Sequence, residues 1–320
     1  MTVHAPLKWV AIGGGTGLAT LLAGLKARLR DVSLTAIVTV TDDGKSSGRL
    51  RDEFSVLPPG DIRSCLVALA DKDVLMTRLF GHRFPGEGEL GGHSAGNLIL
   101  LALSQMSGDF MSAIDQARAL LGIDARVLPS TLDQVDLEAR IGDRDVRGQV
   151  AIKSQLAPIR RLSLVPREAR AFSAAVDAIL DADLITLGPG SLFTSVIANL
   201  LIDGIREAIL ASRATKIYVC NVMTEADETD GFSALDHVTQ LLAHCRDLRL
   251  DYALFNSTPI SAEMRERYAA ERARVLDPPR ADRLPDVDVQ LVSLPLASEE
   301  RVVRHDPARL SQAIFDLYNG

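Results

Sequence analysis

The sequence predicts an α/β fold: a doubly wound, Rossmann-like parallel sheet. Short apolar runs rich in β-branched residues alternate along the chain with longer segments of helical period. Polar or glycine residues follow each run, and the links between runs and helical segments are short. This alternation is typical of a parallel sheet covered by helices on both faces.

The predicted strands follow one another in order. Residues 8–12 form the first strand, which ends in a glycine cluster at 13–17 and leads into a helix whose leucines recur at helical spacing. Residues 34–40 are a continuous apolar run, as expected of a strand buried in a parallel sheet. The later predicted strands are residues 183–187, 216–220, 252–255 and 287–292.

Two later helices are marked by the residues that precede them. A helix at 192–201 follows the second glycine cluster, residues 188–191. The chain closes on a helix at 306–318, with Asp306 as its N-cap and Pro307 at its first position.

One region departs from the strand–helix alternation. Residues 125–164 hold several short extended runs, among them 135–141 and 146–152, with a hairpin turn at 142–145 between these two. We interpret this region as a small antiparallel insertion within a single nucleotide-binding domain that spans residues 1–320.

Composition and charge exclude several classes of function. The 320 residues carry a formal net charge of −7 and only 4% are aromatic, whereas a nucleic-acid binder needs basic stripes or stacking platforms. No apolar run approaches the ~20 residues of a membrane span, and residues 1–10 lack a secretory pattern. Three scattered cysteines fit a reducing compartment. We therefore expect a cytoplasmic protein with no membrane span and no nucleic-acid partner.

Unusual residues collect at the carboxyl ends of five predicted strands. These ends are residues 13–17, 42–48 and 188–191, then Asn221 with Thr224 and Glu225, and residues 256–258. Ligands of open parallel sheets bind in the crevice beyond the carboxyl ends of the strands. Five polar strand ends that converge on one edge therefore predict a ligand site there.

Both glycine clusters indicate contact with phosphate. Residues 13–17 and 188–191 each lie after a strand and before a helix, where free backbone N–H groups and the positive helix end favour an anion. Glycines at such positions can also serve only to make a tight turn. Two clusters in one chain favour a diphosphate held between them.

Two familiar nucleotide motifs fail in detail. The dinucleotide fingerprint G-x-G-x-x-G matches at Gly13 and Gly15, but its third glycine position is Leu18, which weakens an interpretation as an NAD-binding dehydrogenase. A Walker loop ending at residues 44–46 would need a glycine at Thr39, which lies in a predicted strand. The chain is therefore not expected to be a P-loop ATPase.

Three aspartates are candidates for catalysis or for binding Mg²⁺. Asp42 and Asp43 end the second strand, and Asp61 follows a Pro-Pro-Gly sequence. Carboxylates in such places can hold Mg²⁺ or take a proton from an attacking hydroxyl. Alternatively, Asp43 belongs to a turn and Asp61 caps a helix. No His/Cys cluster has metal-ligand spacing, so no resident metal is predicted, although Mg²⁺ could accompany a bound diphosphate.

A further group of polar residues lies near predicted helix starts. His93 and Asn97 precede an apolar helical run, and each could contact a ligand or hold neighbouring loops together. Arg49, Arg51 and Arg63 could bind phosphate with two donors, or could be solvated charges.

Six motifs, in order along the chain, resemble those of one family. They are residues 13–17, 41–51, 59–63, 93–98, 188–192 and 221–229. On these motifs the chain, from about Trp9 to its final helix, resembles the bacterial gluconeogenesis factor proteins (YvcK-like), which are relatives of the 2-phospho-L-lactate transferases (CofD-like) of coenzyme F420 synthesis. The resemblance implies a Rossmann-like fold that binds nucleotides at the sheet edge.

The resemblance implies two different activities. The transferase branch moves phospholactate from a nucleoside diphosphate carrier onto a deazaflavin hydroxyl, and its two site aspartates would correspond to Asp43, or its neighbour Asp42, and to Asp61. The gluconeogenesis factor branch consists of cytoplasmic regulators that are needed for cell shape and wall synthesis on gluconeogenic carbon sources, and its members resemble UDP-sugar binders. The stretch at 224–229, residues 304–306 and the scarcity of aromatics to stack a deazaflavin favour the regulator.

We therefore expect a regulator that binds a UDP-sugar, with a phospholactyl-type or other nucleoside-diphosphate transferase as the alternative. Its partner would be a UDP-sugar or another nucleoside diphosphate, and the symmetric homodimer is an assembly that proteins of this size and class often form. Lys45 stands where the family usually has a glycine. A lysine suits an anionic ligand, but without the glycine the backbone conformation of the loop cannot be predicted from the resemblance.

The candidate binding residues come from both halves of the chain. The glycine loops should hold the diphosphate, Asn221 and Asn256 should bond ribose or base, and Tyr268 and Arg304 should reach the ligand, unless Tyr268 merely packs on its own helix. The full set is Gly13, Gly14, Gly15, Thr16, Gly17, Asp42, Lys45, Ser46, His93, Asn97, Gly188, Gly190, Ser191, Asn221, Asn256, Tyr268 and Arg304, with Asp43 and Asp61 as catalytic residues if the protein is a transferase.

Overall fold

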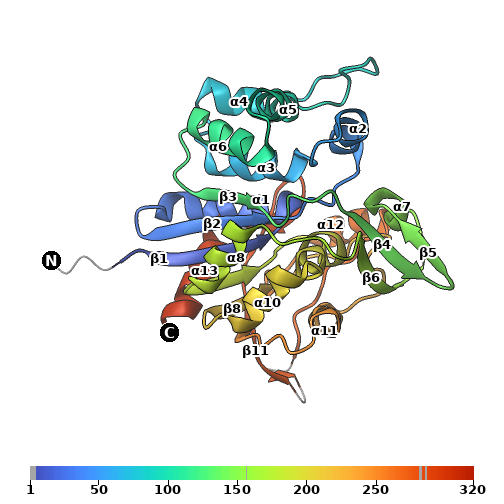
Figure 1. Cartoon of the computed structure of the whole chain (residues 1–320). Helices are drawn as coiled ribbons and strands as arrows, with labels where there is room; N and C mark the ends of the chain where they lie inside the picture. The colour runs from blue at the N-terminus through green and yellow to red at the C-terminus, as the bar shows by residue number, and fades with distance from the viewer. Residues whose placement is uncertain (1–4, 156, 281–282, 285–286) are drawn as a thin grey trace.

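A computed structural model describes residues 5–155, 157–280, 283–284 and 287–320 (Figure 1). Its central sheet has the strand order β10-β11-β9-β8-β7-β1-β2-β3. The strands are β1 (Leu7–Gly13), β2 (Val32–Val38), β3 (Arg126–Pro129), β7 (Leu184–Leu187), β8 (Thr215–Val219), β9 (Tyr252–Asn256), β10 (Arg283–Leu284) and β11 (Val287–Leu294). All neighbours pair in parallel except β10, which is antiparallel to β11.

The strand order reverses at β1. From β1 the chain proceeds to β2 and β3 on one side, and later to β7, β8, β9 and β11 on the other. The crevice between β1 and β7 is thus the point at which an open α/β sheet binds its ligand. The predicted doubly wound parallel sheet is confirmed.

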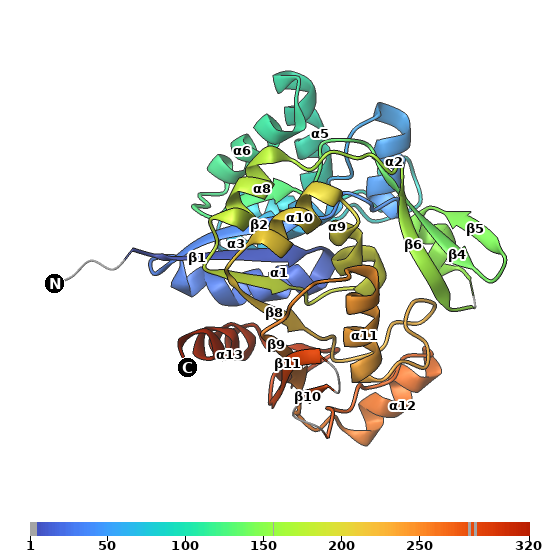
Figure 2. The ribbon, with the colours of Figure 1, turned by 60° about the horizontal axis from the view of Figure 1, so that its bottom comes forward.

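Helices cover both faces of this sheet. On one face α1 (Gly15–Leu25) packs against α3 (Gly60–Leu69) and α13 (Pro307–Asn319), whereas α8 (Ser173–Leu180) packs against α10 (Asp203–Ala211) on the other. Figure 2 shows α13 and the α8–α10 pair on opposite sides of the sheet. The predicted cap of α13 is confirmed, because the Asp306 carboxylate accepts a hydrogen bond from the backbone N–H of Arg309 and Pro307 is the first helical residue.

The connection between β2 and β3 contains five helices. Besides α3 they are α2 (Lys45–Phe54), α4 (Leu75–Gly81), α5 (Ala95–Ser107) and α6 (Phe110–Leu120). They gather beyond the β3 edge of the sheet (Figure 1). The remaining helices include the π-helical segment Leu192–Ile197, α9 (Ala198–Leu200), α11 (Ala234–His244) and α12 (Ala262–Ala270). The helix predicted at 192–201 therefore begins with a π-helical segment.

The range predicted for the antiparallel insertion, 125–164, is wrong at its start, because Arg126–Pro129 is the strand β3 of the central sheet and pairs in parallel with β2. The antiparallel insertion itself is confirmed. It is a three-stranded sheet of order β5-β4-β6, formed by β4 (Asp136–Ile141), β5 (Arg144–Arg147) and β6 (Ile159–Val165). The extended run predicted at 146–152 is wrong beyond Arg147, because Gly148 takes a φ of 97° and the chain turns into the helix α7 (Gln149–Lys153). Burial of Ile152 and a hydrogen bond from the Val150 N–H to the Asp43 carboxylate hold that helix in place.

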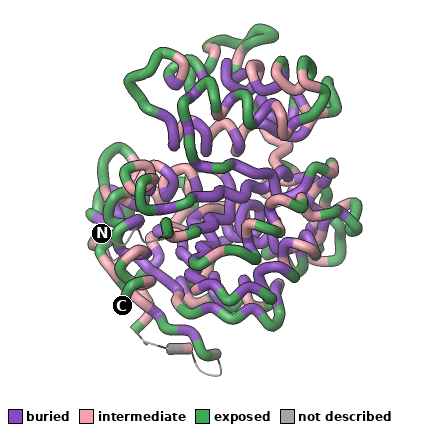
Figure 3. The backbone as a smooth tube through the Cα atoms, turned by 60° about the vertical axis from the view of Figure 1, so that its left-hand side comes forward, coloured by how far each residue is buried: buried purple, intermediate pink, exposed green. Residues whose placement is uncertain are grey.

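Buried residues concentrate on the strands and on the inner helix faces, and exposed residues lie on the outer helix faces and on the connecting loops (Figure 3). The main apolar cluster includes Trp9, whose indole N–H donates to Thr186 Oγ1 at 3.1 Å and so links β1 to β7. A smaller cluster of Val222, Ile260, Met264, Ala297 and Val303 lies under α12 and the hairpin of β12 (Ala297–Glu299) and β13 (Val303–His305). Within the described parts of the chain, no helix has both the length and the hydropathy that crossing a bilayer requires.

Candidate functional site: two joined cavities at the switch point

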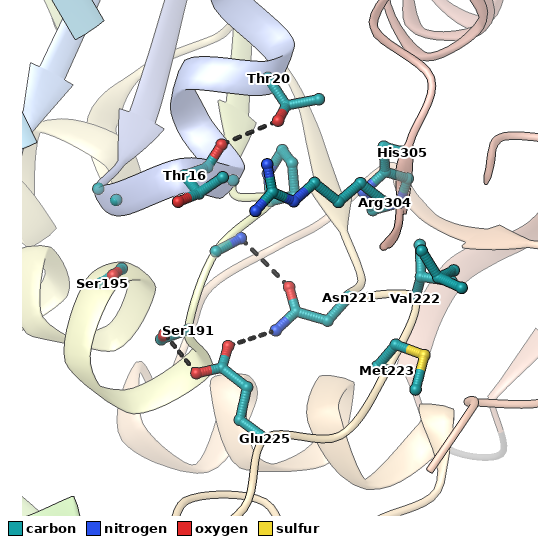
Figure 4. A pocket seen from close by; sticks show the side chains of 16 residues that line it. Thr16, Thr20, Ser191, Ser195, Asn221, Val222, Met223, Glu225, Arg304 and His305 are labelled. Atoms are coloured by element: carbon teal, nitrogen blue, oxygen red, sulfur yellow. Dashed lines mark hydrogen bonds between the residues drawn. The ribbon is translucent and has the colours of Figure 1, made fainter. Parts of the chain in front are cut away.

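Two cavities meet at the carboxyl edge of the sheet. The glycine-loop cavity, of about 410 Å³, lies between the loops after β1, β7 and β8 and the β13 strand (Figure 4). The aspartate cavity, of about 680 Å³, lies between the loop after β2, the start of α3 and helix α7. Both are lined by Gly15, Thr16, Ser191 and Ser195, so together they form one continuous site.

The two glycine loops touch through their backbones. A Cβ atom at Gly17 would lie 2.5 Å from the carbonyl oxygen of Pro189 and 2.6 Å from the backbone nitrogen of Gly190. Gly190 itself has a φ of 151°, which favours glycine. Gly17 and Gly190 therefore let the loops pack together, while Gly15 lines both cavities at the positive N-terminal end of α1.

Gly13 and Gly188 lie outside the lining of either cavity. Gly13 is the last residue of β1, and its carbonyl oxygen accepts a hydrogen bond from the Asn199 side chain at 3.1 Å. Gly188 follows β7 with a φ of 79°, and a Cβ there would lie 2.9 Å from the carbonyl oxygen of Val219. These two glycines support the loops rather than face a ligand.

Asn221 holds the second glycine loop in position. Its Oδ1 accepts a hydrogen bond from the Gly190 N–H at 3.2 Å, and its Nδ2 donates to the Glu225 carboxylate at 3.1 Å. The same carboxylate accepts from the Ser191 hydroxyl at 2.6 Å (Figure 4). Burial, followed by the nearby Glu228 charge, raises the pKa of Glu225, while Lys153 and Ser191 lower it.

Lys153, on α7 of the insertion, joins the two cavities and was not among the predicted site residues. Its Nζ lies 3.1 Å from a Glu228 oxygen and 3.5 Å from a Glu225 oxygen. Glu228 is only 4% exposed and also accepts hydrogen bonds from the backbone N–H groups of Phe193 and Thr194. Burial alone would lower the pKa of Lys153, but the two carboxylates outweigh it and raise that pKa. Lys153 follows directly after the extended run predicted at 146–152, and no sequence pattern points to it as a site residue.

The carboxylates that face the aspartate cavity are Asp42 and Asp61. Burial raises the pKa of Asp61 to about 7, with a further contribution from the Asp42 charge, whereas the Gly15 N–H and the charges of Arg63 and Lys153 act in the opposite direction. Part of the Asp61 side chain is open to the cavity, although protein atoms surround it closely. The capping role considered for Asp61 is wrong, because α3 begins at Gly60, with Pro59 as N-cap.

Asp43 points away from this pair. Its carboxylate accepts a hydrogen bond from the Val150 N–H at 2.9 Å and thereby fastens α7 to the loop after β2. Among the residues that the structure describes, no group of three or more His, Cys, Asp or Glu side chains is arranged to hold a metal ion. Mg²⁺ at Asp42 and Asp61 would therefore need further oxygen ligands from a bound diphosphate and from water.

A series of side-chain hydrogen bonds, in which each donor and acceptor can be assigned, supports the wall of the aspartate cavity. The Arg63 Nε–H donates to Asn97 Oδ1 at 3.1 Å, and Asn97 Nδ2 donates to Ser46 Oγ at 3.0 Å. Because Arg63 can only donate, the orientation of the Asn97 amide is settled, and the hydroxyl proton of Ser46 is left for His93 Nδ1, 2.9 Å away. Ser46 and Asn97 line the cavity, while His93 lies behind them. Burial and the Arg49 charge lower the pKa of His93, which favours the neutral ring.

Lys45 also lines the aspartate cavity, and its backbone has a φ of 48°. This is the left-handed region, in which glycine is unstrained and lysine is not. The conformation thus explains why a glycine would suit this position. The neighbouring Gly44 N–H donates to the Asp42 carboxylate at 3.0 Å, which shapes the same turn.

The C-terminal half contributes Arg304 and His305 directly. The exposed Arg304 side chain extends toward Thr16 and Thr20 (Figure 4), and it has no hydrogen bond or ion pair with any described residue. His305 also lines the glycine-loop cavity, its Nε2 is buried without a partner, and burial lowers its pKa to about 4. His305 was part of a noted stretch but was not predicted as a ligand residue.

Tyr268 and Asn256 act at a distance from both cavities. The Tyr268 hydroxyl accepts a hydrogen bond from the Val303 N–H at 3.0 Å and so fixes the strand that carries Arg304. Asn256 Oδ1 accepts from the backbone N–H groups of Leu296 and Ala297, at 3.1 and 2.8 Å. Both side chains are thus bonded to the backbone that leads to β13, rather than exposed to a cavity.

Comparison with known proteins gives a consistent result. A family model described as 2-phospho-L-lactate transferase CofD matches residues 9–297. A protein from Halalkalibacterium halodurans named gluconeogenesis factor is 42% identical over 311 residues, which cover 96% of this chain and 95% of that protein. A gluconeogenesis factor from Bacillus subtilis is 41% identical over 312 residues, covering 97% of this chain and 98% of that protein.

A solved structure agrees with these relatives. The crystal structure of a protein from Bacillus halodurans superposes with a TM-score of 0.92 at 40% sequence identity and covers 97% of this chain and 100% of that one. The sequence motifs, the reversal of strand order at β1 and these likenesses lead to one conclusion. The chain belongs to the 2-phospho-L-lactate transferase CofD family, and its relatives there include proteins named gluconeogenesis factor.

Proposed function

We propose that the protein binds a nucleotide sugar of the UDP-sugar class and acts as a cytoplasmic regulator rather than as an enzyme. The observation that carries this proposal is the continuity of the glycine-loop cavity with the aspartate cavity across the N-terminus of α1. A diphosphate at Gly15 and Ser191 would have room for one substituent on each side. This is the shape that a sugar joined to a nucleoside through a diphosphate requires.

The groups around the glycine-loop cavity suit the nucleoside diphosphate part. The first turn of α1 offers backbone N–H groups at its positive end. Arg304 offers a guanidinium that no described protein group neutralises, and the buried His305 Nε2 lacks a partner that a ligand atom could supply.

The groups around the aspartate cavity suit a sugar. Asp42 and Asp61 can accept hydrogen bonds from hydroxyl groups. Ser46 and Asn97 add polar atoms, and the hydrogen bond from Arg63 to Asn97 fixes their orientation. The relatives' name supports a role during growth on gluconeogenic carbon sources, and we propose that the protein acts there on wall synthesis and cell shape.

Calorimetric titration with UDP-N-acetylglucosamine, GDP and NAD, each with and without Mg²⁺, tests this function. We expect selective binding of the UDP-sugar and no product after long incubation. Arg304→Ala should weaken binding by about 10-fold or more, because a charge-assisted hydrogen bond is lost. Arg301→Ala, which removes an exposed arginine three positions away, is the control. Equal affinity in the wild type and Arg304→Ala, or no binding of the UDP-sugar, would contradict the proposal.

The transferase is the second candidate, and the Asp42–Asp61 pair favours it. In this case the carboxylates would share Mg²⁺ with the diphosphate or take the proton of an acceptor hydroxyl. It predicts that GDP binds more tightly with Mg²⁺ and that Asp61→Asn loses turnover while it keeps the nucleotide. Tight Mg²⁺-independent binding of the UDP-sugar alone would exclude it, and hydride transfer from NAD would support neither candidate.

A further inference from the structure

A third cavity, of about 650 Å³, adjoins the proposed nucleotide site and shares Thr16, Thr20 and Arg304 with the glycine-loop cavity. It is enclosed by α1, α3, α4 and the start of α13, and we name it the α1–α3 cavity. Its floor is apolar and made of small side chains: Ala19 and Ala23 from α1, Val67 and Ala68 from α3. These residues line neither the glycine-loop cavity nor the aspartate cavity. The volume is in the range of small-molecule sites.

The rim of the α1–α3 cavity is cationic. Arg63, Lys72, Arg78 and Arg304 line it together with His82, and among the described residues no Asp or Glu side chain does. The side chains of Lys72, Arg78 and Arg304 form no hydrogen bond or ion pair with any part of the chain that the structure describes. In a protein of net charge −7, such a gathering of unpaired cations raises the local potential and favours an anion.

A buried hydroxyl in the wall also lacks a partner. Thr77 on α4 lines the cavity, is only 3% exposed, and its Oγ1 has no hydrogen bond. Most buried polar atoms are paired, and one left unpaired costs free energy. A polar atom of a ligand that settled against this wall would remove that cost.

We propose that the α1–α3 cavity binds an organic anion: a molecule with a phosphate or carboxylate group and an apolar aryl or acyl body. The anionic group lies at the rim beside Lys72 and Arg78, and the body lies on the alanine floor. The alanine floor, Lys72 and Arg78 lie outside the nucleotide site, so the proposal holds whether or not a UDP-sugar binds. Arg304 is the charged residue common to this cavity and the glycine-loop cavity.

The test is a fluorescence titration of the full chain with 1-anilinonaphthalene-8-sulfonate, an aryl anion, followed by competition. We expect saturable binding of one probe per chain. Phenyl phosphate or benzoate should displace the probe at concentrations at least 10-fold lower than inorganic phosphate or benzyl alcohol. The better of the first two competitors identifies the anionic group. Displacement by inorganic phosphate alone, or by benzyl alcohol equally well, overturns the proposal.

Two sets of variants locate the probe. Ala23→Trp fills the floor and should weaken binding by at least 10-fold, whereas Ala27→Trp, one turn further on at an exposed position outside the cavity, should not. Lys72→Gln with Arg78→Gln changes only exposed side chains and should weaken binding similarly, with Arg144→Gln on the insertion as the control for charge. Unchanged affinity in the Lys72→Gln/Arg78→Gln protein overturns the site even if Ala23→Trp misfolds.

The same variants separate this site from the proposed function. Ala23→Trp and Lys72→Gln/Arg78→Gln should bind UDP-N-acetylglucosamine with wild-type affinity. If the wild type fails to bind the UDP-sugar but binds the probe as described, the proposed function fails and the α1–α3 site stands. If the UDP-sugar binds and the probe does not, the proposed function stands and the α1–α3 site fails.

Discussion

Replacing Asp61 by asparagine should stabilise the protein, and the gain should grow with pH. The pKa of Asp61 is about 7 in the folded protein against an ordinary value of 3.8, so the folded state binds this proton more tightly than the unfolded state. Well below pH 3.8 the carboxyl group is neutral in both states and does not change the free energy of unfolding. Between pH 3.8 and 7 its ionisation disfavours the fold progressively, and above pH 7 the full cost is present.

The size of the effect follows from the shift. The difference from 3.8 to about 7 is roughly 3 pKa units, which corresponds to about 4 kcal/mol at 1.36 kcal/mol per unit. This figure is an upper bound, because the cavity leaves part of the carboxylate in contact with water. Asparagine has almost the same shape and can still accept the hydrogen bond from the Gly15 N–H. The variant thus removes the charge and little else.

Urea unfolding of the wild type and Asp61→Asn at pH 5, 6, 7 and 8 measures the effect. The difference in free energy of unfolding should be about 1.5 kcal/mol in favour of the variant at pH 5, where the carboxyl group of the unfolded chain is already mostly ionised, and should rise to between about 2 and 4 kcal/mol at pH 8. Asp124→Asn, at an exposed loop position, is the control and should not reproduce the rise. A difference independent of pH, or a variant less stable than the wild type at pH 8, would refute the reasoning.

Three further changes test other parts of the site. Gly17→Ala pushes a Cβ into the facing loop and should lower the free energy of unfolding by about 1–3 kcal/mol, whereas Gly88→Ala, with no atom within 4 Å of the added Cβ, should melt at the wild-type temperature. Lys153→Met leaves the buried Glu228 carboxylate without its cation, so urea unfolding should show a loss of roughly 2 kcal/mol at pH 8, with no loss contradicting the proposed ion pairing. Lys45→Gly relieves a left-handed lysine and should raise the thermal midpoint, with a gain of about 0.5–1 kcal/mol; a lower midpoint would show that the strain is absent.

The fold could be predicted from the sequence because its determinants are local. The strands β1, β2, β7, β8 and β9 are apolar runs of the right length that end in polar or glycine residues, and Asp306 and Pro307 mark the start of α13. The convergence of five strand ends followed from parallel topology alone. The error at residues 146–152 arose because a short apolar run allows either a strand or a helix. A turn at Gly148 and a bond to Asp43, more than a hundred positions away, made the choice.

The detailed site could be predicted only in part. The glycine loops, the aspartates at the end of β2 and the aspartate after Pro-Pro-Gly stand out by residue type, and Gly15, Asp42 and Asp61 do line the candidate site. Which of two adjacent aspartates faces the cavity was not evident, because that depends on where the insertion packs. Lys153 and His305 carry no motif, and they join the site because α7 and the β13 strand fold over it.

The sequence by itself determined the class of fold, the edge of the sheet that holds the site and the loops suited to phosphate, since these depend on residues that are neighbours in the chain. Only the tertiary structure decided which charges meet. The raised pKa of Asp61, the pairing of Lys153 with two glutamates and the unpaired cations around the α1–α3 cavity all depend on segments far apart in the sequence. Electrostatic energy depends on distance in space and on burial, and neither is set until the chain has packed.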